Sequence, residues 1–367
     1  MAPPVATEVS TTTTNNSIPL TARDSESDYQ YKHLLPVVDK SEFYPPLEPF
    51  EHIDPAARAI KLPESEQRAF LKNATSVRNL TPGLGTEVVG IDLTSLDGPA
   101  RDQLALEVAR RGVLVFRDQA KFLAQTGDQF KEWGSYFGRL HIHPTSGHPA
   151  QIPELHVTYY DGTQPFYREL LSLMTTTLWH SDVSCELQPP GLTTFFLLAQ
   201  PSSGGGDTLF LSQVLALKKL SPPFVDFLKT LKAVHSGIPQ AHYARDRSRS
   251  GVGRRDPVEH VHPVVRKHPV TGDEILYVNQ QYTTHIVGLK KEESDTILNF
   301  LYNHIARVAD AQARIHWEPN TVLLWDNRVT AHTPIVDFAE TSDRRHGVRI
   351  TPQAERPIPA LESLELP

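Results

Sequence analysis

The stretch LTTFFLLAQPSSGGGDTLFLS, residues 192–212, decides the fold, because it places two runs of β-favouring residues on either side of three glycines. Short apolar runs rich in Leu, Phe and Thr and bounded by turn residues predict buried strands. The glycines suit a tight turn that delivers Asp207 and Thr208 into the second strand. Similar runs recur upstream and downstream: ELHVTYY, TTTLWHSD, EILYVNQQYTTHIV, ARIHWEP, TVLLWDNR and HGVRITP. This texture predicts a mainly β protein with helices, built as an antiparallel sandwich or barrel.

Helical patterns interrupt the strand-like runs without alternating with them. We expect helices over 99–111, around Trp133, and over about 213–232 and 290–307. The lack of regular strand–helix alternation argues against a doubly wound parallel sheet. Neither GxGxxG nor GxxxxGK[ST] occurs, so the sequence gives no local support to a dinucleotide-binding or P-loop function.

The chain divides into four expected segments. Residues 1–30 are rich in Ser, Thr, Asn and Pro, which predicts a mobile tail. Residues 31–74 are punctuated by proline and predict an arm that wraps the main domain. Residues 75–357 form the expected catalytic domain, and residues 358–367 form a short C-terminal tail.

Composition limits the partners and the compartment. The formal net charge of −7 gives no general attraction to nucleic acid or to an acidic membrane surface, which favours small-molecule partners. The lone cysteine, Cys185, cannot form an intramolecular disulfide, and we assign it to packing. Neither a secretory signal nor an apolar stretch of ~20 residues is found. These features predict a cytoplasmic protein and leave open a homo-oligomer.

The segment TTTLWHSDVSCE, residues 175–186, carries a candidate metal site at His180 and Asp182. In an extended strand, residues two apart point to the same face. Two histidines and one carboxylate on one face of Fe(II) leave positions open for a chelating cosubstrate and O₂. The triplet alone is not specific, because His52 and Asp54, in the proline-rich arm, have the same spacing. A half-buried strand pair with ordinary hydrogen bonds is the alternative for His180 and Asp182.

Two later segments supply a candidate third metal ligand and candidate anion-binding arginines. The strand TVLLWDNR is followed by His332, a candidate third ligand. The terminal run RRHGVRI has Arg345 and Arg349 four apart, so an extended backbone points both to one face. Inward arginines in an apolar sheet are costly unless each finds an anion, which predicts anionic small molecules. Surface arginines near a chain end are the alternative.

Four blocks, WHSD, GGDT, WDNRVTAH and RRHGVR, occur in this order over roughly residues 80–355. In these blocks the chain resembles the taurine/2-oxoglutarate (TauD/TfdA-like) dioxygenase family. The resemblance implies a double-stranded β-helix, or jelly roll, core decorated by α-helices. It also implies Fe(II), 2-oxoglutarate as cosubstrate and O₂, with oxidation of a substrate C–H bond and release of succinate and CO₂.

The resemblance assigns roles residue by residue. It implies that His180, Asp182 and His332 bind the iron, and that Thr208 and Arg345 hold the distal carboxylate of 2-oxoglutarate. No protein nucleophile or general base is needed, so no catalytic residue is expected beyond the metal ligands. An arginine fork with a hydroxyl is a good carboxylate clamp, which agrees with this assignment.

The substrate side departs from the taurine pattern. Arg349 and His143 resemble the sulfonate-binding arginine and its histidine, whereas Ser146, Thr176 and Tyr282 stand where the family has tyrosine, asparagine and phenylalanine. We therefore expect an anionic substrate other than taurine. A different sulfonate is one expectation, and an amino acid or other carboxylate in a biosynthetic pathway, undergoing hydroxylation, desaturation or ring closure, is the other.

Other readings remain open at the level of sequence. His141 and His143 form an HxH pair of the kind that binds metal in cupin-like proteins. A non-catalytic anion-binding jelly roll would use the arginines alone, and a zinc hydrolase would use the same triad with bound water. The segment HYARDRSRSGVGRRDP, residues 242–257, is expected to be a flexible loop, either solvated or covering the substrate, and a nucleic-acid contact is the weaker alternative.

Overall fold

The computed structural model describes residues 17–19, 28–39, 41–162, 178–246 and 253–367. Its strands are β1 (Ser17–Pro19), β2 (Val37–Asp39), β3 (Ser76–Asn79), β4 (Thr86–Val89), β5 (Val113–Phe116), β6 (Leu155–Tyr160), β7 (Leu192–Ala199), β8 (Thr208–Ser212), β9 (Lys232–Ser236), β10 (Glu259–Pro263), β11 (Val265–Lys267), β12 (Glu274–Leu276), β13 (Thr283–Ile286), β14 (Gln312–Ile315), β15 (Val322–Asp326), β16 (Thr330–Pro334), β17 (Arg345–Ile350) and β18 (Ile358–Pro359). Its α-helices are α1 (Ala56–Ala59), α2 (Gly98–Arg111), α3 (Ala120–Leu123), α4 (Gly127–Ser135), α6 (Gln213–Lys218), α7 (Pro222–Lys229), α8 (Ile238–Asp246) and α9 (Lys291–Arg307). Short 3₁₀ turns lie at Lys32–Leu34, Ala69–Leu71, Leu93–Ser95 and Ala309–Ala311.

Two sheets pack face to face around an apolar interior. The larger sheet has the strand order β3-β4-β5-β15-β7-β17-β6, and the smaller has the order β14-β8-β16. Phe195 and Leu323 of the larger sheet share one buried cluster with Phe210 and Ile315 of the smaller sheet. Successive side chains of a strand point to opposite faces of its sheet, so each sheet buries one face against the other. The strand-like runs of the sequence therefore form a sandwich.

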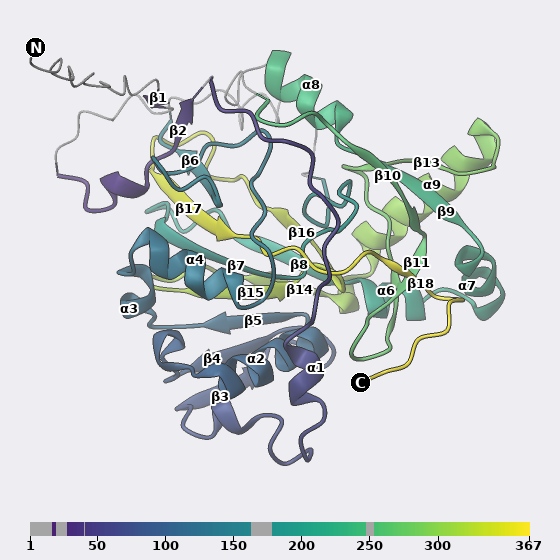
Figure 1. Ribbon diagram of the computed structural model, residues 1–367, viewed down its shortest axis with the longest axis horizontal. Helices are drawn as coiled ribbons and strands as arrows, with labels where there is room; N and C mark the ends of the chain where they lie inside the picture. Colours follow the sequence, from purple (N-terminus) through teal and green to yellow (C-terminus); the bar gives the residue numbers. More distant parts are fainter. Residues whose placement is uncertain (1–16, 20–27, 40, 163–177, 247–252) are drawn as a thin grey trace, which may run out of the picture.

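Helices cover the outer face of the larger sheet (Figure 1). Helix α2 begins where the Asp97 side chain accepts a hydrogen bond from Ala100 N, and it ends at Gly112, whose φ of +71° terminates the helix. Leu104 of this helix and Phe130 of α4 join a second cluster with sheet residues such as Phe196. Both faces of the larger sheet are therefore buried.

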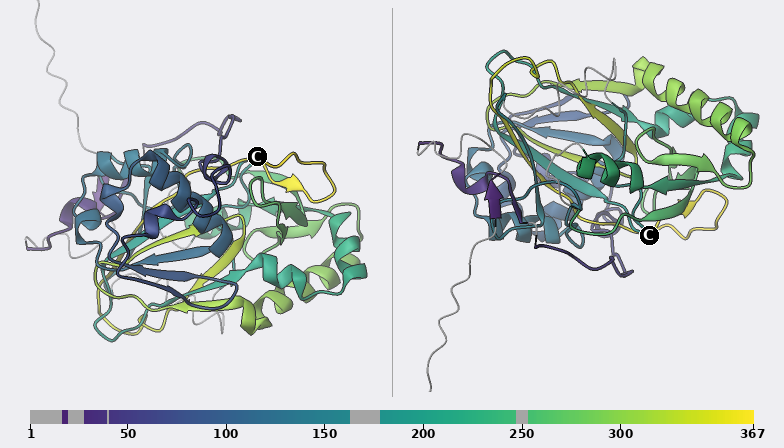
Figure 2. Two further views of the ribbon diagram at one scale, coloured as in Figure 1. Left: turned by 90° about the horizontal axis from the view of Figure 1, so that it is seen from below. Right: turned by 90° about the horizontal axis from the view of Figure 1, so that it is seen from above.

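A separate group of elements packs beside the two sheets (Figure 2). Strands β9, β10 and β13 form a three-stranded sheet, and β11, β12 and β18 form another. Their cores share a buried cluster with α6, α7 and α9. No helix among the described residues has the length and apolar character needed to cross a membrane.

The segment between β2 and α1 is held along the surface of the main domain (Figure 1). Its Tyr44 N donates to Arg254 O at 2.7 Å. Phe50 exchanges two backbone hydrogen bonds with the side chain of Gln188, each 2.9 Å long. Asp54, near the start of α1, forms an ion pair of 2.6 Å with Arg328.

The structure differs from the expected elements in two places. His180 makes only an isolated bridge to His332, and Asp182 lies in a turn, so the expected HxD strand is absent. The expected helix over 213–232 is broken into α6 and α7, because Pro222 can begin a helix but cannot continue one.

The expected tails also make contacts. Within the expected mobile tail, β1 pairs with β2, and Tyr29 Oη hydrogen-bonds His346 Nδ1 at 2.8 Å. At the other end of the chain, β18 pairs with β11. Residues from both expected tails therefore contact the main domain, Tyr29 through a side-chain hydrogen bond and β18 through strand pairing.

Candidate metal centre and anion pocket

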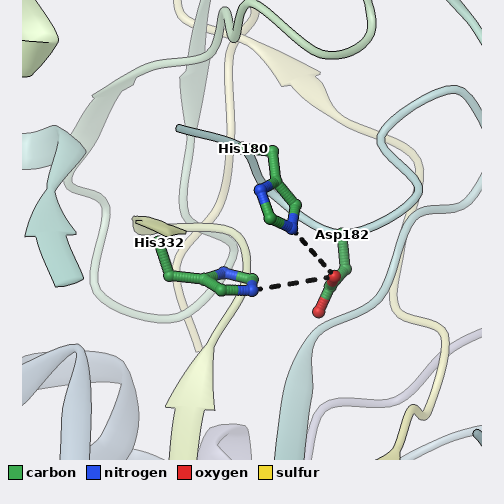
Figure 3. A group of neighbouring side chains, drawn as sticks. All are labelled: His180, Asp182 and His332. Carbon is green, nitrogen blue, oxygen red and sulfur yellow. Dashed lines mark ion pairs between the residues drawn. The ribbon is translucent and has the colours of Figure 1, made fainter. Parts of the chain in front are cut away.

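The side chains of His180, Asp182 and His332 converge on one point between the two sheets (Figure 3). Asp182 Oδ1 lies 3.6 Å from His180 Nε2 and 3.8 Å from His332 Nε2. One ligand atom from each of the three residues lies within 4.8 Å of the other two. Among the described residues, this is the group of histidines and acids with the geometry to hold an ion.

Backbone contacts fix these three side chains. His180 and His332 exchange two backbone hydrogen bonds, of 3.0 and 2.8 Å, which align the two histidines side by side. His180 Nδ1 lies 3.0 Å from Leu178 O, so Nδ1 carries the proton and Nε2 keeps its lone pair. Asn327 accepts a hydrogen bond from Asp182 N at 2.8 Å and donates one to Asp182 O at 3.1 Å.

The local charges favour metal binding. Burial opposes ionisation of Asp182, but Arg349, His332 and His180 outweigh it and hold the pKa of Asp182 far below its usual value. Burial, with His180 adding to it, lowers the pKa of His332 to about 3. At neutral pH the centre therefore offers a carboxylate and a neutral imidazole, the forms that bind a divalent cation.

The three residues fit an Fe(II) ion. Ligands on one face of an octahedral ion, bound at about 2.1 Å, stand about 3 Å apart, and the two separations from Asp182 Oδ1 exceed this by less than 1 Å. Asp182 Oδ2 is buried and has no hydrogen-bond partner among the described residues. Buried carboxylate oxygens are normally satisfied, so a cation beside Asp182 accounts for it.

Thr208 and Arg345 lie on strands of the two different sheets, β8 of the smaller and β17 of the larger. Thr208 begins β8 and accepts a hydrogen bond from Trp317 Nε1 at 3.3 Å. Arg345 begins β17, donates to Gly206 O at 3.3 Å and stacks over the Phe338 ring at 5.3 Å. The structure thus brings a buried guanidinium to the glycine turn that precedes Thr208.

Arg349 reaches the metal centre directly. Its Nη1 donates to Asp182 Oδ1 at 2.5 Å, and its Nη2 lies 2.5 Å from His156 Nδ1. His156 in turn packs on His143, with ring centroids 4.3 Å apart. Arg349, His156 and His143 therefore form one continuous wall beside Asp182.

His156 was not identified as a site residue from the sequence. The structure brings it to the centre because β17 pairs with β6 in a register that sets Arg349 opposite His156. The sequence carries no signal for this pairing, since strands far apart in the chain pair through non-local contacts.

The two remaining substrate residues of the sequence assignment differ in outcome. Tyr282 is buried, and its hydroxyl donates to Gln240 Oε1 at 3.3 Å. Burial raises the pKa of Tyr282, and the charges of Cys185 and Asp182 raise it further. Thr176 lies outside the described residues.

The HxH pair is not a metal site. His141 Nε2 lies 2.9 Å from Glu186 Oε1, whereas His143 packs against His156, and the two rings are nearly perpendicular. The alternative triplet at His52 is also explained without metal, because its acid partner is committed to an ion pair with an arginine.

The arginine-rich segment is partly ordered rather than wholly loop-like. Residues 242–246 belong to α8, and Arg254 and Arg255 are buried. Arg254 Nη2 donates to His143 O at 2.6 Å and Ser146 O at 2.5 Å. The expected solvated role is therefore wrong for Arg254 and Arg255, which are both buried, with two backbone carbonyls bound to the Arg254 guanidinium and Glu186 beside that of Arg255.

Comparisons with known proteins identify the same chemistry. The family model for taurine catabolism dioxygenase TauD, TfdA family, matches residues 76–351. An alpha-ketoglutarate-dependent sulfonate dioxygenase of Saccharomyces cerevisiae is 45% identical, over 91% of this chain and 80% of that protein. An alpha-ketoglutarate-dependent sulfate ester dioxygenase of Pseudomonas putida is 27% identical, over 75% of this chain and 88% of that protein.

A solved structure shares the fold. The crystal structure of a taurine dioxygenase from Burkholderia xenovorans superposes with a TM-score of 0.61 and 29% identity, over 78% of this chain and 92% of that one. The predicted jelly-roll core with helices is thereby confirmed. The protein is an oxidoreductase that depends on 2-oxoglutarate, Fe(II) and O₂ and acts on small molecules. The chain belongs to the taurine catabolism dioxygenase TauD, TfdA family.

Proposed function

We propose that this dioxygenase oxidises a C–H bond of a small organic sulfonate, with His180, Asp182 and His332 as the iron ligands. The observation that carries the proposal is the position of Arg349, whose guanidinium touches the ligand carboxylate Asp182 at 2.5 Å. An oxyanion bound by Arg349 would therefore lie within a few bond lengths of the metal. The sulfonate dioxygenase of Saccharomyces cerevisiae supports this choice of anion.

Fe(II) held by His180, Asp182 and His332 would supply the oxidation of the substrate C–H bond by O₂, coupled to the conversion of 2-oxoglutarate into succinate and CO₂. The protein's part is to hold three partners at fixed positions. Thr208 and Arg345 hold the far carboxylate of 2-oxoglutarate, because a guanidinium and a hydroxyl together satisfy a carboxylate.

The substrate anion is assigned to Arg349, with His143, Tyr282 and Thr176 as the other proposed substrate residues. Nε of Arg349 is buried and has no hydrogen-bond partner among the described residues, although Nη1 and Nη2 are both engaged. A buried donor of a charged group is costly without an acceptor, so an incoming oxyanion gains from it. His156, which contacts Arg349, holds the fork in place.

A second candidate substrate class is an amino acid or another carboxylate. Guanidinium forks bind carboxylates as well as sulfonates, so Arg349 alone does not separate them. The same bound oxidant would then hydroxylate, desaturate or cyclise the substrate. We also propose that the enzyme works in the cytoplasm, since its lone Cys185 is buried and unpaired with another cysteine, and a homo-oligomer stays a prediction.

Substrate-dependent succinate release tests the proposal. Alkanesulfonates of two to six carbons, the matching sulfate esters and the matching carboxylates would be supplied at equal concentration with Fe(II), 2-oxoglutarate and O₂. We expect turnover above the substrate-free background for at least one sulfonate. Turnover with carboxylates alone would reject the sulfonate assignment in favour of the second candidate.

A further inference from the structure

We propose that Asp54, in the arm before α1, is a positioning residue for the metal centre. It acts through Arg328 and the turn that joins β15 to β16, and it never touches the metal or the substrate. The inference rests on the ligand set proposed above. Asp54 lies outside residues 76–351, which the family model matches.

The turn between β15 and β16 holds two ligand-bearing segments together. On one side, the Asn327 side chain forms hydrogen bonds with both the backbone N–H and the backbone C=O of Asp182. On the other side, β16 begins at Thr330 and carries His332. Thr330 O accepts a hydrogen bond of 2.9 Å from Ser181 Oγ, within the first ligand segment. Any shift of this turn therefore changes the separation of Asp182 and His332.

Arg328 stabilises the turn from behind. Its guanidinium is buried, with 3% of the residue exposed. It pairs with Asp326 at 2.6 Å, with Asp54 at 2.6 Å and with Glu355 at 3.1 Å. Arg328 N also donates to Asp326 Oδ1 at 2.9 Å, so the ion pair and the turn share one carboxylate. Asn327 lies between these two charged residues in the chain.

Two of the three carboxylates around Arg328 are shared with other cationic or donor groups. Asp326 also accepts from His268 Nε2 at 3.1 Å, and Glu355 also pairs with Arg266 at 2.5 Å. Asp54 gives its one described ion pair to Arg328 and uses its other oxygen to accept from Ala56 N. Asp326 makes the bidentate contact with Arg328, and Asp54 is the one of the three carboxylates whose only described cationic partner is Arg328.

The arm holds Asp54 at a fixed position. Upstream, Phe50 is bound on both its backbone groups by Gln188, which also donates to Ala354 O at 3.1 Å. Downstream, the Asp54 side chain caps the first turn of α1. A carboxylate fixed on both sides orients its partner guanidinium more strongly than a freely moving one does.

Replacing Asp54 with asparagine keeps the shape but removes the charge. Arg328 then keeps its ion pairs with Asp326 and Glu355 but loses one of three buried carboxylate partners, and removing a partner from a buried ion-pair network allows the guanidinium to shift. Because Asn327 adjoins Arg328, we expect Asp182 to lose its fixed orientation. Residues that orient metal ligands typically change metal affinity 10- to 100-fold, so we expect a loss of about 10-fold in Asp54→Asn.

The experiment is an anaerobic Fe(II) titration of the full chain with 2-oxoglutarate present, followed by the visible charge-transfer absorbance, and a parallel Co(II) titration without 2-oxoglutarate. The matched control is Arg58→Gln, which breaks another arm ion pair, to Asp102, that is not connected with the turn. Asp54→Glu restores the charge and tests rescue. Thermal unfolding of each metal-free protein shows that all variants are folded at the titration temperature.

The result expected is an affinity loss of about 10-fold for Asp54→Asn, partial recovery for Asp54→Glu and less than a 2-fold change for Arg58→Gln. Unchanged affinity in Asp54→Asn, or equal losses in Asp54→Asn and Arg58→Gln, would overturn the inference. His332→Ala tests the proposed ligand set separately from the role of Asp54. Metal binding that survives this mutation would overturn the ligand set itself.

Discussion

Arg349 Nη1 lies 2.5 Å from Asp182 Oδ1, the same carboxylate oxygen that faces the Nε2 atoms of His180 and His332. The proposed substrate anchor and the proposed metal ligand are therefore in direct contact. An ion pair of this kind also fixes the rotamer of Asp182 before metal arrives, because the guanidinium is itself held by His156. Because the proposed anchor Arg349 contacts the proposed ligand Asp182, the effects of a mutation at one of these residues should be compared with the effects of a mutation at the other.

Removing a ligand should abolish the centre. His332→Ala takes one of the three donors away, and a cation held by the two remaining donors binds far more weakly. We expect loss of the charge-transfer band in the anaerobic Fe(II) and 2-oxoglutarate titration, with turnover reduced at least about 100-fold. His304→Ala is the control, because His304 lies on α9 and bonds Ala216 O. A band of wild-type intensity in His332→Ala would contradict the ligand assignment.

The two arginines of β17 should separate the two anions. Arg345→Ala removes the proposed clamp on 2-oxoglutarate and should raise the KM for 2-oxoglutarate about 10- to 100-fold, the worth of a hydrogen-bonded charge. Arg349→Ala should raise the KM for the prime substrate by a similar factor. Steady-state kinetics with each substrate varied in turn measures both, and equal effects of either mutation on both constants would refute the two-anion assignment.

The glycine turn before Thr208 offers a paired test. Gly206 has φ of +87°, and a Cβ added there would meet Arg345 Nε at 2.9 Å. Gly204 has φ of +79°, and a Cβ added there would meet nothing within 4 Å. Both alanine variants strain the backbone by about 1 kcal/mol, so only Gly206→Ala should also raise the KM for 2-oxoglutarate. Thermal unfolding compares the strain, and the same KM in both variants would argue against the clamp at Arg345.

Acid should destabilise the metal-free protein over a defined window. Burial lowers the pKa of both His235 and His346 to about 3. The unfolded chain binds these protons below about pH 6.5, whereas the folded chain does not until about pH 3, so unfolding free energy falls as pH drops through this range. Each histidine should account for about 2 kcal/mol at pH 5 relative to pH 7.

Urea denaturation at pH 7 and pH 5 measures this loss. His346→Gln removes one titrating group and should lessen the difference between the two pH values by about 2 kcal/mol. His285→Gln is a suitable control, since His285 is exposed on β13. An identical pH dependence in the wild type and His346→Gln would show that His346 is not the source.

The parts of the site that depend on local spacing could be predicted from the sequence. The strands over residues 192–212 and the helix over 99–111 follow from hydrophobic period and turn residues, and the structure has them nearly at those bounds. The grouping of His180 and Asp182 was also expected, although a bridge and a turn, rather than a strand, bring the two side chains together.

The parts that depend on non-local packing could not be predicted. The register of β17 on β6 gives His156 its place beside Arg349, and no local pattern encodes a register between strands so far apart. In the sequence, Asp54 stood out only because it has the same spacing from His52 as Asp182 has from His180. Its ion pair could not be predicted, because its partner Arg328 lies 274 residues further along the chain. Arg254 was read as solvated because arginine in a Gly- and Ser-rich segment usually is, and its burial depends on carbonyls of another segment.

The last strand of the larger sheet, β17, lies between β7 and the edge strand β6. During synthesis the sheet therefore keeps a gap until residue 350 has left the ribosome, and β7 exposes an unpaired edge to other chains until then. Truncated products should consequently aggregate rather than accumulate as partly active enzyme. The order of the strands makes completion of the chain a condition for both solubility and chemistry.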